Sequence, residues 1–131
     1  MKITRYKTES YEEEVPNTLE GFKDWKFSSG GTTGEDFNIF ARLFKKHIQK
    51  NLPVGSNLVA FSKGHYYVSG FVERGDKFVY FSVPDVRFFP GEWYNNILVR
   101  TAKHEKDYTG GSNGSTTLEF FSVKVLNLLE G

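Results

Sequence analysis

The feature that most constrains the fold is a pair of strand-like segments joined by Gly75-Asp76. Residues 65–74 and 77–83 are rich in β-branched and aromatic side chains, and the dipeptide between them is typical of a two-residue hairpin turn. Such a short connection fixes the register, because a slip of one residue would turn every side chain to the opposite face. The predicted cross-strand pairs are Val72 with Val79, Gly70 with Phe81, Val68 with Val83, Phe71 with Tyr80, and Ser69 with Ser82.

The two faces of this hairpin differ in composition. The first face is mainly aliphatic and is expected to meet the core, whereas the second carries Tyr67, Phe71, Phe78 and Tyr80 together with serines. Exposed aromatic rings of this kind could stack on the bases of single-stranded nucleic acid. Aromatic side chains contribute strongly to cores, however, so we expect this second face to be buried, beneath a helix, and keep the open binding surface as the alternative.

Two segments have the apolar periodicity of amphipathic helices. The first runs from Glu35 to about Lys50, and Thr32 with Glu35 resembles a capping box at its start. The second follows Thr116, which we expect to be its N-cap, with Glu119 three residues later. The expected buried faces comprise Phe37, Phe40, Ala41, Phe44 and Ile48 in the first helix, and Leu118, Phe121, Val125, Leu128 and Leu129 in the second.

The remaining segments complete the predicted architecture. Residues 57–62 and 96–102 have strand-like composition, and the polar stretch 103–115 includes the segment 109–114, which is expected to be flexible. We predict an α+β fold in which an antiparallel three- or four-stranded sheet is flanked by two amphipathic helices, in the order α-β-β-β-(β)-α. Residues 1–34 form an N-terminal extension, with a short edge strand at 2–7 and a Gly-rich connector, packed on a core of residues 35–131; together they make one domain.

Composition limits the classes of function. The 131 residues include 17 basic and 16 acidic side chains, a formal charge of +1, so any surface that attracts nucleic acid must be local. The chain has no cysteine, which removes thiolate nucleophiles and thiolate metal sites and is typical of a cytoplasmic protein. No apolar run is long enough to span a bilayer. We therefore expect a cytoplasmic protein without a membrane segment.

Catalytic and metal-binding patterns are weak. The three histidines are scattered, and the Gly-rich stretch 30–34 lacks the Lys-Ser or Lys-Thr of a phosphate-binding loop. A metal-dependent nuclease would need carboxylates and a lysine held together on strands, and Asp85, Glu105 and Lys106 are the candidates. We assign no catalytic residue, no metal ligand and no cofactor.

Two basic groups and one aromatic loop are the candidate binding features. If the fold brings the basic groups together, they could follow phosphates or meet an acidic partner, and otherwise they solvate outer faces. The aromatic loop 88–94 offers Trp93 and Tyr94 as exposed anchors of the type found at protein interfaces. The basic groups are Arg42, Lys45, Lys46 and Lys50 in the first helix, and Arg100, Lys103, His104 and Lys106 after the last strand.

The chain is compact and rich in Lys, Asn and aromatic residues. One stretch is most typical of this composition: Arg100-Thr101-Ala102-Lys103-His104-Glu105-Lys106-Asp107-Tyr108-Thr109-Gly110-Gly111-Ser112-Asn113. The chain resembles small accessory proteins carried by phages, plasmids and conjugative elements of low-GC bacteria. The resemblance implies action by binding, including inhibition of host defence nucleases, and assigns no residue.

Three functions follow as hypotheses. The leading one is a non-enzymatic protein that binds a protein partner and modulates or inhibits a nucleic-acid or defence enzyme of the host. The second is direct binding of double- or single-stranded nucleic acid. The helix–strand–strand–strand–helix order of the chain resembles the double-stranded RNA-binding fold. The chain departs from that fold in length, with an inserted aromatic loop, and has Thr116-Thr117-Leu118-Glu119 where that fold has a lysine cluster. The third is a small metal-dependent nuclease.

Overall fold

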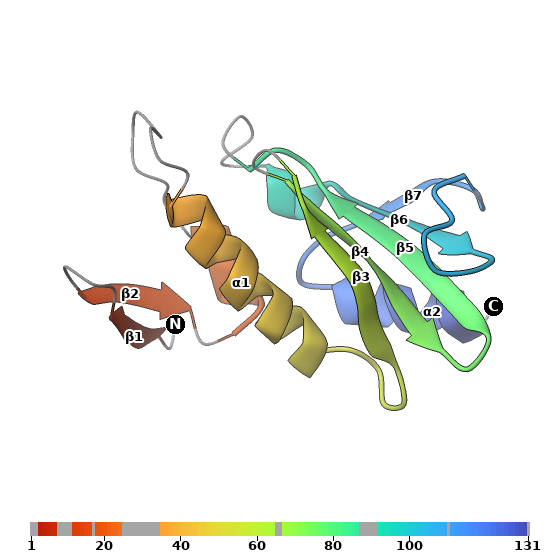
Figure 1. The fold of residues 1–131 in the computed structure, drawn as a ribbon, viewed down its shortest axis with the longest axis horizontal. Helices are drawn as coiled ribbons and strands as arrows, with labels where there is room; N and C mark the ends of the chain where they lie inside the picture. The colour runs from red at the N-terminus through yellow and green to blue at the C-terminus, as the bar shows by residue number, and fades with distance from the viewer. Residues whose placement is uncertain are drawn as a thin grey trace.

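The chain folds around one five-stranded antiparallel sheet, with one α-helix on either side of it in the sequence (Figure 1). The computed structural model describes residues 3–7, 12–16, 18–24, 35–64, 67–86, 92–109 and 111–130. The predicted α+β architecture, an antiparallel sheet flanked by helices, is confirmed. Thr32 of the expected capping box lies outside the described residues, as does the connector 25–34.

The sheet follows the order of the chain, with every neighbouring pair of strands antiparallel. It has five strands, whereas the sequence predicts three or four. The last strand, β7, has only three residues, which is too short to show an alternating pattern, and it pairs with Ile97–Val99 of β6. The five strands are β3 (Asn57–Lys63), β4 (Val68–Arg74), β5 (Lys77–Val83), β6 (Ile97–Ala102) and β7 (Gly114–Thr116).

The hairpin β4–β5 has the predicted register in all five pairs. Gly75 has a φ of 63°, in the left-handed region that a tight hairpin turn requires and that glycine adopts without steric cost. Val72, Val79 and Phe81 are completely buried on the first face, as expected. The register therefore directs the aliphatic face to the core.

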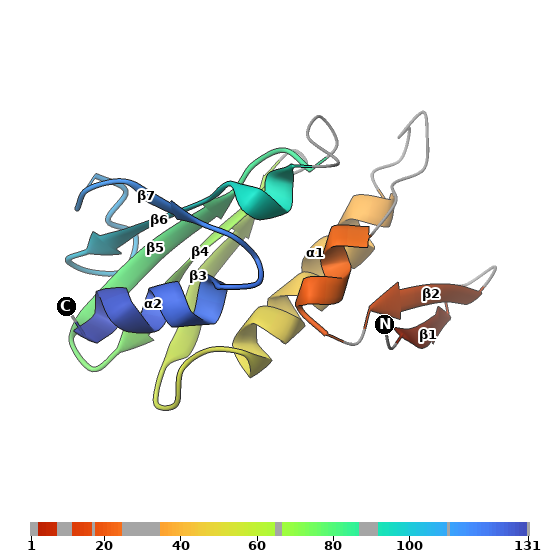
Figure 2. The same ribbon diagram turned by 180° about the vertical axis from the view of Figure 1, so that it is seen from behind.

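The first α-helix has its predicted bounds, whereas the second begins later than the predicted cap at Thr116 implies. Helix α1 spans Glu35–Lys50 and lies beside β3, whereas α2, Phe121–Glu130, packs against β5 and β6 (Figures 1 and 2). The expected apolar faces of both helices are buried or packed against the core. The predicted cap is wrong: Thr116 belongs to β7, and α2 begins only at Phe121, after a turn in which the hydroxyl of Thr117 accepts the Phe120 N–H at 3.2 Å.

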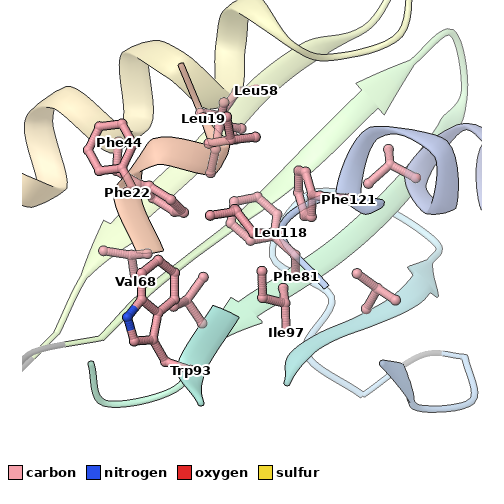
Figure 3. Packing of buried hydrophobic residues seen from close by; sticks show 14 of the residues in the cluster. Leu19, Phe22, Phe44, Leu58, Val68, Phe81, Trp93, Ile97, Leu118 and Phe121 are labelled. Atoms are coloured by element: carbon pink, nitrogen blue, oxygen red, sulfur yellow. The ribbon is translucent and has the colours of Figure 1, made fainter. Parts of the chain in front are cut away.

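A group of edge-to-face rings joins α1 to the rest of the core (Figure 3). Phe22 comes from a short 3-10 helix, η1 (Glu20–Asp24), and its ring centroid lies 5.6 Å from Phe40 and 5.3 Å from Phe44. Phe22, Phe40 and Phe44 are fully buried. The N-terminal part of the chain thus contributes a central side chain to the core.

Trp93 is a core residue, which corrects its prediction as a surface aromatic. It lies in a second 3-10 helix, η2 (Trp93–Asn95), is 1% exposed, and makes edge-to-face contacts with Phe40 and Phe44. Tyr94 is half-buried against the same core. The Tyr94 carbonyl accepts the Leu118 N–H at 2.7 Å, so η2 is held beneath the approach to α2. Residues 88–91 of the predicted aromatic loop lie outside the described residues.

The N-terminal residues form a separate two-stranded antiparallel sheet. Strand β1 (Ile3–Lys7) confirms the predicted short strand, and β2 (Glu12–Pro16) contains the acidic run of residues 12–14. The chain then enters η1, which contributes Leu19 and Phe22 to the buried cluster.

Phe22→Ala should destabilise the protein strongly, since a large aromatic side chain would be removed from a fully packed position. We expect a loss of about 3–5 kcal/mol in the free energy of unfolding, measured by urea denaturation. Val54→Ala is the matched control because Val54 is 96% exposed, and it should change stability by less than about 0.5 kcal/mol. A loss below about 1 kcal/mol for Phe22→Ala would contradict the central position of this ring.

Candidate functional site

The outer face of α1 is the first candidate binding surface. Arg42, Lys45, Lys46 and Lys50 are all exposed, opposite the buried apolar face of the helix. The Lys45 ammonium lies 5.7 Å from the centroid of the Phe61 ring on β3, so its stem follows the junction of helix and sheet. The basic stripe predicted from the sequence therefore lies on the exposed face of a single helix.

The residues of the second predicted basic group differ in exposure. Lys103, His104 and Lys106 are exposed in the loop between β6 and β7, whereas Arg100 is half-buried on β6. Helix α1 lies at the β3 edge and this loop follows β6 near the opposite edge, and both ribbon views show them apart (Figures 1 and 2). The structure does not bring the two predicted basic groups together.

Arg100 holds the β6–β7 loop on the second face of the sheet. Its Nη1 donates to the Asn113 side-chain oxygen at 3.1 Å, and its Nη2 donates to the Tyr108 carbonyl. The guanidinium carbon also lies 4.7 Å from the centroid of the Tyr80 ring, within the range of a cation–π contact. Arg100, which the sequence predicts to contact a ligand, instead binds Tyr108 and Asn113 of its own chain and so clamps the loop.

Tyr108 covers the aromatic centre of the second face. Its ring makes edge-to-face contacts with Phe71, at 5.4 Å between centroids, and with Tyr80, at 5.6 Å. Phe71 is fully buried, as expected, so the alternative of an open binding surface is wrong for this ring, and Tyr80 and Phe78 are half-buried. Only Tyr67 of the four is exposed. The expected burial is therefore largely present, but a loop rather than a helix provides it at Phe71 and Tyr80.

Asp107 organises the loop in which the sequence predicts a flexible segment. Its side chain is buried and accepts hydrogen bonds from the Lys103 N–H at 2.9 Å and from the Thr109 N–H at 3.1 Å. These backbone hydrogen bonds lower the pKa of Asp107, because they favour the ionised carboxylate. Gly111, with a φ of 72°, lies so close to Thr101 that a Cβ would meet the Thr101 backbone. The loop is therefore attached to the sheet at several points.

Arg100→Met should loosen this loop without disturbing the hairpin. The variant removes two charge-assisted hydrogen bonds and the contact with Tyr80, so we expect about tenfold faster amide hydrogen exchange at Lys103, Asp107 and Thr109. Exchange at Val79 and Phe81 should not change.

Lys103→Met is the matched control for this experiment. The Lys103 side chain is exposed, and its backbone N–H, which binds Asp107, remains in the variant. Unchanged exchange in Arg100→Met, or equal acceleration in Lys103→Met, would contradict the clamp.

His47 is a buried titratable group of α1. Its ring lies 5.3 Å from the Phe22 ring, and burial, with Lys50 and Lys46 nearby, lowers its pKa below 6.5. Burial disfavours the imidazolium, and the two lysines repel it further. The positive charges of Lys46 and Lys50 on the exposed face of α1 therefore help to lower the pKa of His47 on the buried side of the same helix.

The lowered pKa of His47 predicts a loss of stability in acid. The unfolded chain binds a proton near pH 6.5 and the folded chain binds it only at lower pH, so the His47 contribution is complete above 6.5 and is lost below it. In His47→Gln, the fall in unfolding free energy between about pH 6.5 and 4.5 should be shallower. Lys50→Gln should raise the His47 pKa in an NMR titration. A His47 pKa above 6.5 in the wild type would contradict this assignment.

Two apolar side chains at the start of α2 form a further exposed feature. Phe120 is 55% exposed and Val123 is 56% exposed, one turn apart and off the buried face of the helix. The Ser122 hydroxyl donates to the carbonyl of Asn51, the residue after α1. This bond places the apolar turn beside the end of the basic helix. The sequence already contains the signal, since both residues fall outside the predicted apolar face.

The nuclease candidates do not form a site. Asp85 follows the end of β5, which lies beside the start of β6, whereas Glu105 and Lys106 follow the end of β6. The antiparallel register therefore places Asp85 and the other two residues at opposite ends of these strands. Among the residues that the structure describes, no three His, Asp or Glu side chains are grouped as metal ligands would be.

Comparisons with known proteins give no relative: no family model, no curated protein and no solved structure matches the chain. Within the described part of the chain, no helix is both long and apolar enough to cross a membrane.

Proposed function

We propose that this chain is a non-enzymatic binding protein that docks a protein partner on the basic face of α1 and the adjoining apolar turn of α2. The observation that carries the proposal is the Ser122–Asn51 hydrogen bond, which joins the start of α2, where Phe120 and Val123 are exposed, to the residue that follows Lys50. An exposed aromatic anchor beside a charged rim has the composition of a protein interface.

The chemistry of this surface defines the partner. No acidic residue occurs from Phe37 to Lys50, so the helix offers a positive face to an acidic surface. Phe120 and Val123 need an apolar pocket on the same partner, since exposed apolar side chains gain most when water is excluded around them. In line with the resemblance to accessory proteins of mobile elements, we propose a host nucleic-acid or defence enzyme as the partner, which the chain modulates or inhibits from the cytoplasm.

Direct nucleic-acid binding remains the second candidate, because the α1 stripe could follow phosphates. Three other observations count against direct nucleic-acid binding. Arg100 is engaged with the loop, the ring of Phe71 is buried, and the two basic groups are apart. A phosphate-binding surface would also have no use for exposed Phe120 and Val123.

Photo-crosslinking from Gln49, an exposed position within the stripe, tests the proposal. With a benzophenone side chain at position 49, we expect one discrete protein adduct in a lysate of the natural host. Lys45→Glu with Lys46→Glu, and separately Phe120→Ser with Val123→Ser, should each reduce the adduct by about tenfold or more, as expected for interface anchors.

Lys77→Glu with Lys103→Glu is the matched control, because it makes the same change in charge at exposed lysines outside both surfaces. It should leave the adduct unchanged. A mobility shift on random duplex DNA or RNA that Lys45→Glu with Lys46→Glu abolishes and Phe120→Ser with Val123→Ser leaves intact would favour nucleic acid instead. An adduct that is insensitive to both double variants would contradict the proposed surface.

A further inference from the structure

Phe71, Tyr80 and Arg100 form a row across three neighbouring strands on the second face of the sheet. Tyr108 is seated on this row through its ring, which meets Phe71 and Tyr80, and through its carbonyl oxygen, which accepts a hydrogen bond from Arg100. An aromatic ring together with the carbonyl of the same residue is a combination that any Phe, Tyr or Trp in a peptide can present.

We propose that this row is a binding site for an aromatic residue of a partner peptide, and that Tyr108 occupies the site as an internal substitute. The β6–β7 loop then acts as an autoinhibitory cover, which a peptide must displace. This inference does not depend on the surface formed by α1 and α2, since the row lies on the opposite face of the sheet from the helix-packed core.

The burial pattern distinguishes Tyr108 from a core residue. Tyr108 is 49% exposed, although Phe71 beneath it is fully buried. The main core packs against the other face and includes neither Phe71 nor Tyr108. Displacement of Tyr108 would therefore uncover the row and leave the packing between the sheet and the helices in place.

The β6–β7 loop does not provide a hydrogen-bond acceptor for every nitrogen of the Arg100 guanidinium. Arg100 Nε is buried and has no hydrogen-bond partner in the described structure, whereas both terminal nitrogens have one. A buried donor without an acceptor is unfavourable. Lys106, within the same loop, has a φ of 70°, which is strained for a residue other than glycine. Both features reduce the advantage of the closed state, so a peptide with a further backbone acceptor could compete with Tyr108.

An NMR titration of the full chain with N-acetyl-tyrosinamide tests the site. Tyr108→Ala should bind this probe at least about tenfold more tightly than the wild type, because the internal competitor for two ring contacts is removed. The largest shifts should fall on Phe71, Tyr80 and the Arg100 side chain. Tyr108→Phe should behave as the wild type, since it keeps the ring that Tyr108→Ala removes, and the backbone carbonyl is present in both variants.

N-acetyl-leucinamide is the control probe and should bind neither protein. Equal affinity of wild type and Tyr108→Ala for N-acetyl-tyrosinamide, or equal binding of the two probes, would overturn the proposal. If Tyr108→Ala loses the dispersed spectrum of a folded protein, Asn113→Ala decides in its place, because it removes one of the two guanidinium hydrogen bonds of the closed loop. Tighter probe binding by Asn113→Ala than by the wild type supports the site, and equal binding contradicts it.

Discussion

The register of the β4–β5 hairpin determines the rest of this structure. Because Gly75-Asp76 closes the turn in two residues, the pairing of Val72 with Val79 and of Phe71 with Tyr80 leaves no alternative assignment of faces. The aliphatic face receives both α-helices and the two 3-10 helices, and the aromatic face receives the β6–β7 loop. A slip of one residue would exchange these surfaces and leave neither set of elements with a matching partner.

The two faces are stabilised by different kinds of interaction. On the first, Phe22 and Trp93 join segments distant in sequence through ring packing, which depends on shape and exclusion of water. On the second, Arg100 uses directed hydrogen bonds to fix a polar loop over only two rings. The first face therefore provides global stability, whereas the second is a place where a local change need not unfold the domain.

Sequence periodicity predicted the elements well because each helix and each strand of the central hairpin has a distinct apolar pattern. It failed where a side chain acts through a tertiary contact. Trp93 and Tyr94 stand in a segment with turn residues, and nothing local shows that the Leu118 N–H holds it against the core. Arg100 can hold the β6–β7 loop only because the folded loop brings Asn113 back to it. Composition alone describes this part of the loop as flexible and does not show the contact. The α1 stripe was predictable because exposure of a helix face follows directly from burial of the opposite face.

The register creates a second face that the β6–β7 loop covers through Tyr108. The most direct measurement is a set of nuclear Overhauser effects between aromatic rings in the isotopically labelled wild-type protein. We expect cross-peaks from the Tyr108 ring to the rings of both Phe71 and Tyr80, which lie within 6 Å of it between centroids. A Tyr108 ring with random-coil chemical shifts and contacts only to its sequence neighbours would contradict this covering of the second face.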